Sequence, residues 1–290
     1  MKSLQDRVAT VTGAGRGIGR AIALAYASEG AQLILAARTE SELQETVAVC
    51  RTLGAVALPV ATDISDVEQV KQLVDTALNR FGHVDVLVNS AGVYGPIGPV
   101  AENALDDWRQ ALAVNLFGPL YLCRALLPHF IDRKQGKIIL LGGGGATAPL
   151  PCFSAYAASK AGLARLADTL AAELVEDNVQ VNVIAPGLVD TKLQDEVLAA
   201  GQKSGSLLHK IAQARETGVG AVSPNVAAEL AVFLASAASG RLTGKLIAAP
   251  YDPWREWAGK ADELNATALY TIRRLDPFTI KPLISDLDRW

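Results

Sequence analysis

The chain has 290 residues, of which 50% are hydrophobic and 20% charged, and its formal net charge is −3. This length and apolar content favour one α/β domain with appendages, and the slightly acidic balance argues against a nucleic-acid partner. Because we find no apolar N-terminal leader and no run of 18 apolar residues, we expect a cytoplasmic protein without a membrane span.

Seven short β-rich apolar runs alternate with longer segments of helical periodicity. The predicted strands are residues 8–12, 32–37, 55–60, 84–89, 137–141, 179–184 and 245–249. The predicted helices are residues 18–28, 42–53, 67–81, 105–132, 155–176 and 226–235, and Gly30, Gly54 and Gly82 stand where helices would stop. Three scattered cysteines indicate buried thiols, and three widely spaced histidines give no metal-site pattern.

This alternation predicts a Rossmann-type, doubly wound sheet of about seven parallel strands with helices on both faces, in one domain over residues 1–249. Ligands of such sheets bind at the carboxyl ends of the strands. Residues 188–223 interrupt the alternation and are interpreted as a mobile lid, or as a helical hairpin without catalytic consequence. The tail, residues 250–290, holds Trp254, Trp257 and Trp290 and should pack on its own domain, on a neighbouring subunit or over the active-site mouth.

A glycine cluster stands directly between the first predicted strand and the first predicted helix. It comprises Gly13, Gly15, Arg16, Gly17, Ile18 and Gly19. Glycines let backbone N–H groups and the helix N-terminus approach a pyrophosphate, so this placement predicts phosphate binding rather than a simple turn. The spacing is T-G-x-x-x-G-x-G, because Ile18 replaces the glycine of the usual dinucleotide fingerprint.

That loop resembles the short-chain dehydrogenase/reductase family, and further matches follow in the order that the family requires, over about residues 5–249. The resemblance implies that Asp63 meets the adenine ring. It also implies that the strand-ending Asn89, Ala91 and Gly92 lie beside the cofactor. The remaining matches, which would hold the nicotinamide, are Pro186, Gly187 and Thr191.

Arg38 follows the second predicted strand, where NAD-binding sites generally place an acidic residue for the ribose 2′-hydroxyl. Ala37 offers no carboxylate, while Arg38, with Arg16 nearby, favours a 2′-phosphate and therefore NADP(H) over NAD(H). The alternative is that both arginines are solvated and either cofactor is accepted.

Tyr156 and Lys160 are four residues apart, so a helix would present both to one site. They match the family's Y-x-x-x-K, which implies that Tyr156 protonates the carbonyl oxygen while Lys160 holds the nicotinamide ribose. Asn115 resembles the family's active-site asparagine, which would anchor a water that relays protons to Lys160. A nearby ammonium, together with the positive charge of the oxidised nicotinamide, should lower the pKa of the Tyr156 phenol. The alternative is an exposed helix with an incidental tyrosine and lysine.

One family element is missing, because Gly143 stands where a serine would bind the substrate oxygen. Losing such a donor typically costs about 3 kcal/mol. Candidate replacements are the backbone around Gly143 and Gly144, the hydroxyl of Thr147 and that of Ser154, for which a helix N-cap is the simpler role.

These features predict an NADP(H)-dependent ketone or aldehyde reductase, interconverting a carbonyl and a secondary alcohol. The opposing hypothesis is a cofactor-binding protein with little or no turnover. The substrate is a small molecule of unspecified class. The apolar helices 105–132 and 155–176 suggest a homodimer or homotetramer, although core packing explains them equally well.

Overall fold

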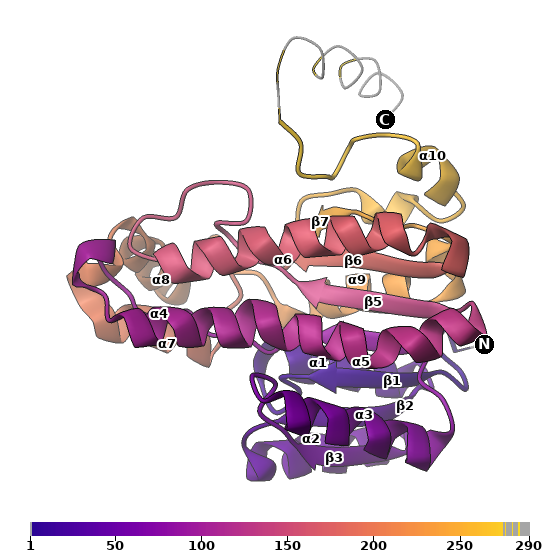
Figure 1. The fold of residues 1–290 in the computed structure, drawn as a ribbon. Coiled ribbons are helices and arrows are strands. Elements are labelled where there is room, and N and C mark those ends of the chain that lie inside the picture. Colours follow the sequence, from indigo (N-terminus) through magenta and orange to yellow (C-terminus); the bar gives the residue numbers. More distant parts are fainter. Residues whose placement is uncertain (1, 275, 277–279, 281–283, 285–290) are drawn as a thin grey trace.

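The computed structural model describes residues 2–274, 276, 280 and 284, and within them seven parallel strands form one sheet in the order β3-β2-β1-β4-β5-β6-β7 (Figure 1). The predicted seven-stranded, Rossmann-type sheet is therefore confirmed. The strands are β1 (Val8–Thr12), β2 (Gln32–Ala37), β3 (Ala57–Ala61), β4 (Val86–Asn89), β5 (Gly136–Leu141), β6 (Val179–Ala185) and β7 (Leu246–Ala248). The strand order reverses between β1 and β4, which places a ligand crevice at their carboxyl ends.

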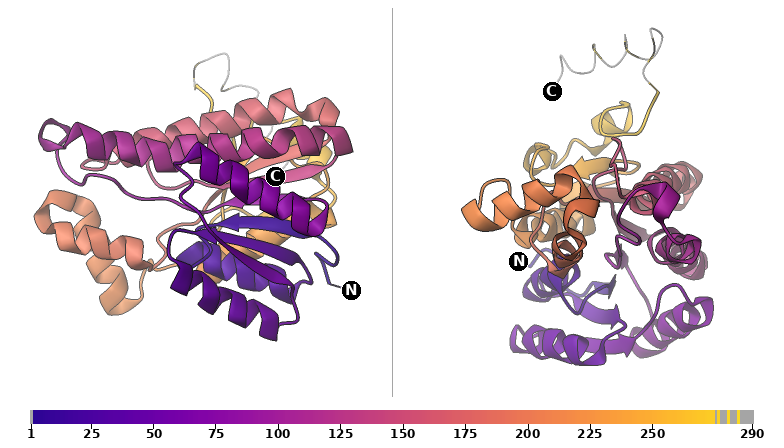
Figure 2. Two further views of the ribbon diagram at one scale, coloured as in Figure 1. Left: turned by 60° about the horizontal axis from the view of Figure 1, so that its bottom comes forward. Right: turned by 90° about the vertical axis from the view of Figure 1, so that its left-hand side faces the viewer.

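Helices cover both faces of the sheet, as Figure 2 shows. One face carries α1 (Gly17–Ser28), α2 (Glu40–Thr52) and α9 (Pro224–Ala235). The other carries α3 (Val67–Phe81), α5 (Gly118–Arg133) and α6 (Ser154–Glu173), and α4 (Leu105–Leu112) packs on α6. Every residue of β1 is buried because both of its faces are covered, and this explains why the strands read as continuous apolar runs.

The predicted helix over residues 105–132 consists of three parts. A π-helical segment, η2 (Ala113–Phe117), joins α4 to α5. Among the described residues, the stretch Leu105–Arg133 is also long and apolar enough to cross a bilayer, but α5 packs against α3 and β5. A core helix of this kind meets the same measure, so the stretch gives no argument for a membrane span. Three short 3-10 helices lie between the longer elements: η1 (Val100–Glu102), η3 (Val175–Asp177) and η5 (Ala237–Ser239).

Residues 188–223 form a helical hairpin at the carboxyl edge of the sheet, where the strand arrows point in Figure 1. It contains α7 (Lys192–Ala200), the turn η4 (Gly201–Ser204) and α8 (Ser206–Thr217). Gly201 and Gly205 bound the turn with positive φ angles of 56° and 58°, which glycine adopts readily. A parallel bridge between Val189 and Val222 closes the base of the hairpin. The helical form of the alternative is thus observed, whereas the movement of the hairpin and its consequence for catalysis are not tested and stay predictions.

The described part of the tail packs on its own domain. Trp254, in η6 (Trp254–Glu256), and Trp257 are buried in the core beneath α9, and α10 (Ala261–Asn265) joins the same cluster. The Tyr270 ring lies 4.6 Å from that of Trp257. Trp290 lies outside the described residues.

Candidate active site

A cleft of about 550 Å³ lies at the carboxyl edge of the sheet. Its walls come from the loops that follow β1, β2, β3, β4, β5 and β6, with α7 and α8 above them. Most of the predicted site residues therefore line one cavity, although they come from segments spread over the first 191 residues.

The glycine loop after β1 is fixed by close packing. Gly13 has a positive φ of 65°, and a side chain there would come within 2.8 Å of the Ala91 backbone nitrogen. A Cβ atom on Gly19 would lie 2.2 Å from the carbonyl oxygen of Gly13. Only glycine fits at these two positions, so the loop folds back tightly on the start of α1.

The N-terminus of α1 faces this cleft without a cap. Its N-cap residue is Arg16, which makes no side-chain capping hydrogen bond, and the first turn holds no acidic residue. Backbone N–H groups and the helix dipole are thus available to an anion. The loop and helix N-terminus fit a pyrophosphate, as a dinucleotide cofactor requires.

Arg38 marks the far end of the cleft, after β2. Its side chain is exposed and lines the cleft, and within the described part of the chain it forms no hydrogen bond or ion pair. Arg16 instead lies 3.7 Å from a Glu42 oxygen, which also accepts a hydrogen bond from Lys192 at 3.1 Å. Burial raises the pKa of Glu196, and the charges of Arg16 and Arg38 oppose that rise.

The loops after β3 and β4 form the adjoining wall. Asp63 lines the cleft, and one of its oxygens accepts hydrogen bonds from the N–H and hydroxyl of Ser65 at 2.9 and 2.7 Å. Asn89 is buried behind the wall, where its Oδ1 accepts from the Thr12 hydroxyl at 3.0 Å. Ala91 and Gly92 line the cleft directly. Asn89 therefore supports the loop from behind.

The turn after β6 brings Pro186, Gly187 and Thr191 to the same cleft. A Cβ on Gly17 would lie 3.2 Å from the Thr191 methyl carbon, so the start of α7 stands directly over the phosphate loop. The hairpin and the glycine loop thus meet across the predicted cofactor site.

Tyr156 and Lys160 both lie in the first turns of α6 and line the cleft. The Lys160 ammonium donates a 2.7 Å hydrogen bond to the Leu141 carbonyl oxygen at the end of β5 and stands 5.6 Å from the centre of the Tyr156 ring. Lys160 is 4% exposed and Tyr156 is 8% exposed. The expected shared face is therefore present, whereas the exposed-helix alternative is wrong.

Burial dominates the titration of this pair. It lowers the pKa of Lys160 to about 8, and it raises the pKa of Tyr156 far above its ordinary value, with Tyr94 adding to the rise. Loss of hydration therefore outweighs the expected effect of the ammonium, which is turned toward Leu141, whereas the effect of an oxidised nicotinamide on this pKa stays a prediction. The phenol consequently keeps its proton at neutral pH.

Asn115 lies in the π-helical segment η2 and is fully buried. Its Oδ1 accepts from Val93 N–H at 2.9 Å, and its Nδ2 donates to the Val93 carbonyl at 2.8 Å and the Ser159 hydroxyl at 3.0 Å. The residue does not line the cleft but ties the β4 loop to α6 behind Lys160. Its predicted role in a proton relay remains a prediction.

The candidate replacements for the serine lie in different places. Gly143, Gly144 and Thr147 line the cleft, whereas Ser154 does not. The Ser154 hydroxyl accepts a hydrogen bond from Trp108 Nε1 at 3.2 Å, and α6 begins at Ser154, so the expected N-cap role is wrong. Ser154 is occupied in joining α4 to α6.

Sequence reasoning missed Tyr94, which follows the Asn89–Gly92 element. Its ring lies 4.8 Å from the Tyr156 ring, and its hydroxyl donates to Gln194 Oε1 of α7 at 3.2 Å. Tyr94 is part of an apolar wall of the cleft beside Tyr156. The other members of this wall that line the cleft are Leu150, Leu188, Leu193 and Leu207. Its position after the β4 loop was the available signal.

Comparisons with known proteins agree with this geometry. The family model described as short chain dehydrogenase matches residues 7–201, and the chain belongs to this family. It is 35% identical over 243 residues to 3β-hydroxysteroid dehydrogenase 1 of Eggerthella lenta, covering 83% of this chain and 91% of that protein. It is 35% identical over 248 residues to the short chain dehydrogenase/reductase astE of Aspergillus oryzae, covering 85% and 94%.

Two solved structures show the same fold with a cofactor. An NAD⁺-bound xylitol dehydrogenase superposes with a TM-score of 0.79 at 28% identity, covering 85% of this chain and 98% of that one. A 7α-hydroxysteroid dehydrogenase in complex with NADH and 7-oxo glycochenodeoxycholic acid superposes with a TM-score of 0.76 at 29% identity, and the match covers 84% of this chain and 93% of that one. The chain is thus an oxidoreductase of alcohol and carbonyl groups that uses a nicotinamide cofactor.

Proposed function

We propose that this chain is an NADP(H)-dependent reductase that converts the carbonyl of an apolar ketone or aldehyde into an alcohol, with Gly143 in place of the family serine. The observation that carries the proposal is the Tyr156 phenol, which lines the cofactor cleft beside buried Lys160 and has no hydrogen-bond partner among the described residues. A phenol so placed is free to meet a substrate oxygen.

The protein's own residues supply the proton. The bound nicotinamide supplies the hydride in reduction. Because burial raises its pKa, Tyr156 is neutral and can donate its proton to the carbonyl oxygen. Lys160, with a pKa lowered to about 8, is poised near neutral pH to return a proton to the phenol, and Asn115 is proposed to support that relay from behind.

Backbone amides are proposed to replace the serine hydroxyl. Within the described residues, the N–H groups of Gly143, Gly144 and Gly145 donate to no acceptor, although the segment borders the cleft. Preorganised N–H donors stabilise a developing oxyanion as a hydroxyl does. Thr147 stays a second candidate donor, because it also lines the cleft.

The preference for NADP(H) rests on the charges at the end of β2. Arg38 stands there unpaired, with no carboxylate at Ala37 to hold a ribose 2′-hydroxyl. Glu42 engages Arg16 and Lys192, so Arg38 is the guanidinium proposed to bind the 2′-phosphate.

The apolar wall indicates the substrate class. Tyr94 and leucines from three segments face the space beside Tyr156, and they suit an apolar, ring-bearing carbonyl compound better than a sugar. Two relatives named above are hydroxysteroid dehydrogenases, which supports this size and polarity. The hairpin α7–α8 is proposed to close over such a substrate.

The first experiment measures consumption of NADPH and NADH against apolar cyclic ketones, aliphatic ketones, aldehydes and keto sugars. Tyr156→Phe is the control, and calorimetry measures cofactor binding by both proteins. We expect turnover with the cyclic ketones that the Tyr156→Phe variant loses while it still binds NADPH. The alternative function, cofactor binding without catalysis, is favoured by Gly143 and predicts binding with no turnover of any compound.

A homodimer or homotetramer is proposed as well. Leu105 and Phe117, on the α4–α5 side, are 70% and 42% exposed, and such apolar residues suit a contact between copies. Light scattering that shows only a monomer would remove this part of the proposal.

A further inference from the structure

Gly143 borders the phenol of Tyr156. A Cβ atom built on Gly143 would lie 2.1 Å from the Tyr156 Oη, 3.0 Å from Cζ and 3.3 Å from Cε1. Two non-bonded atoms cannot approach to 2.1 Å, so the phenol occupies the volume that any side chain at position 143 would need. The φ angle of Gly143 is outside the left-handed region, and the conflict therefore comes from Tyr156 alone.

The tyrosine ring is held on its other side. Tyr94 packs against it at 4.8 Å, and Tyr94 in turn lies 5.1 Å from the Phe153 ring and donates to Gln194. A buried aromatic ring moves only if its neighbours move too. Tyr156 therefore cannot swing toward Tyr94 without displacing that ring.

The helix that carries Tyr156 is fixed as well. Trp108 binds Ser154 at the start of α6, and a Cβ on Gly145 would come within 2.9 Å of the Ala157 Cβ. The loop after β5 thus lies directly on the first turn of α6. Neither the helix nor the loop offers an easy retreat from an added side chain.

We infer that Gly143 is a positioning residue for Tyr156: its missing side chain lets the phenol rest against the backbone of residues 142–145, beside the free amides. The effect of this positioning on the reaction rate rests on the proposed reductase function, whereas its effect on packing and stability does not. On this inference, a serine at position 143 would not restore the family arrangement. The added Cβ would displace the catalytic phenol.

The kinetic test compares Gly143→Ser with Gly143→Ala. Displacement of a reacting group by about 1 Å costs roughly a hundredfold in rate, so we expect both variants to lose about ten- to a hundredfold in kcat, with the Kd for NADPH unchanged. A simple missing-donor account predicts that Gly143→Ser gains activity while Gly143→Ala behaves as wild type. Either of those two results would overturn the inference.

A second test needs no catalysis. Overpacking should lower the Tm of Gly143→Ala by about 3–8 °C, and removal of the Tyr156 hydroxyl in Gly143→Ala/Tyr156→Phe should recover at least about half of that loss. Gly144→Ala is the matched folding control, because its Cβ would meet nothing within 4 Å, and we expect its Tm to equal that of wild type. Equal losses in both tyrosine backgrounds, or no loss at all, would contradict the inference. A protein with this coupling but without turnover would refute the proposed function and leave the positioning role standing.

Discussion

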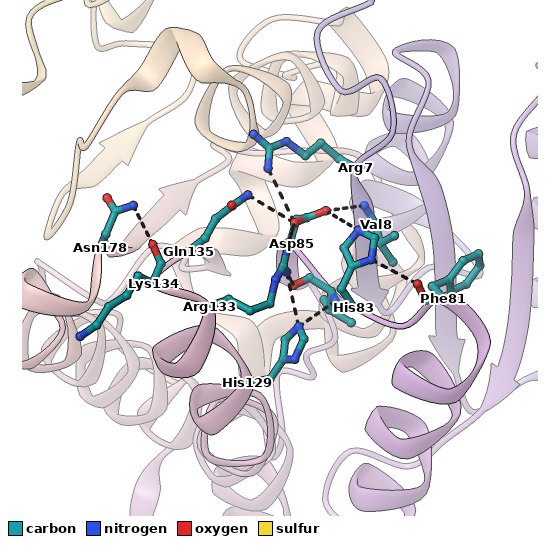
Figure 3. A network of polar contacts seen from close by, with 11 residues as sticks. Arg7, Val8, Phe81, His83, Asp85, His129, Arg133, Lys134, Gln135 and Asn178 are labelled. Atoms are coloured by element: carbon teal, nitrogen blue, oxygen red, sulfur yellow. Dashed lines mark hydrogen bonds and ion pairs between the residues drawn. The ribbon is translucent and has the colours of Figure 1, made fainter.

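The two edges of the sheet differ in whether their polar groups have hydrogen-bond partners. At the amino edge, Asp85 is 4% exposed and saturated with partners: its oxygens accept from Val8 N–H at 2.9 Å and Arg133 at 3.0 Å (Figure 3). Arg7 and His83 add contacts at 3.7 and 3.3 Å. At the carboxyl edge, the Tyr156 phenol and the amides of residues 143–145 have no partner among the described residues.

This difference separates stability from function. A buried carboxylate is tolerated when hydrogen bonds and opposite charges surround it, so the Asp85 network holds β1, β4 and the α5–β5 connection together. Unpartnered donors that border a cleft contribute nothing to the fold, and they are available to a ligand. Mutations at the two edges should therefore give opposite phenotypes.

The largest effect is expected at Lys160. Lys160→Met keeps an unbranched side chain of similar length but removes the ammonium beside Tyr156, and we expect kcat/KM to fall by about 10²- to 10³-fold. Steady-state kinetics with the best ketone substrate measure the loss, and circular dichroism checks the fold. Unaltered kinetics would remove Lys160 from the proton route.

Asp85→Asn is expected to lower stability and leave catalysis unchanged, the opposite of Lys160→Met. The change withdraws a charge from between Arg7, His83 and Arg133, and because the arginines are partly exposed we expect a loss of about 2 kcal/mol in the free energy of unfolding, or roughly 5 °C in Tm. Calorimetry measures it. At 25 °C, kcat should equal that of wild type; a specific loss of kcat without loss of Tm would break the comparison between the edges.

A smaller effect is expected at Arg38, the unpaired guanidinium of the carboxyl edge. Arg38→Ala should raise the KM for NADPH by about 10- to 100-fold, the value of one charge-assisted contact to phosphate, and leave the KM for NADH within about twofold. Equal effects on both cofactors, or a lower wild-type KM for NADH than for NADPH, would overturn the proposed preference for NADP(H).

The smallest expected effect is the change of kcat/KM with pH. Burial lowers the pKa of Lys160 to about 8, so the ammonium is present below that pH and lost above it. For reduction, kcat/KM should be level near neutrality and fall by about tenfold per pH unit above about pH 8. Tyr156 adds no inflection in this range, because burial raises its pKa further. The inflection should be absent in Lys160→Met, and its persistence there would assign it to another group.

Much of the fold was predictable because strand and helix periods are local properties. The strands β1 and β2 and the helix α3 occupy the predicted residues. For residues 188–223 a helical hairpin was only the alternative, and the bounds of α7 and α8 were not predicted, because the Gly201–Gly205 run between them reads as an irregular loop. The π-helical segment around Asn115 was missed because one extra residue in a helix leaves the apolar pattern almost unchanged.

The site was predictable as a set of residues but not as a geometry. Family motifs named many of the residues that line the cleft, although Asn89 and Asn115 lie behind its wall, whereas the place of Tyr94 depends on packing between three segments distant in sequence. The sequence showed a glycine where a hydroxyl was expected at position 143. Only the three-dimensional arrangement shows that the Tyr156 phenol fills that space.

The protein is proposed to transfer hydride without the family serine. The most direct test incubates the protein with NADPH deuterated at C4 on the transferred face, together with an apolar cyclic ketone, and analyses the product by mass spectrometry. We predict an alcohol that carries one deuterium on the former carbonyl carbon, and none with Tyr156→Phe. Tight NADPH binding with no deuterated alcohol from any ketone or aldehyde, using cofactor labelled on either face, would contradict the account.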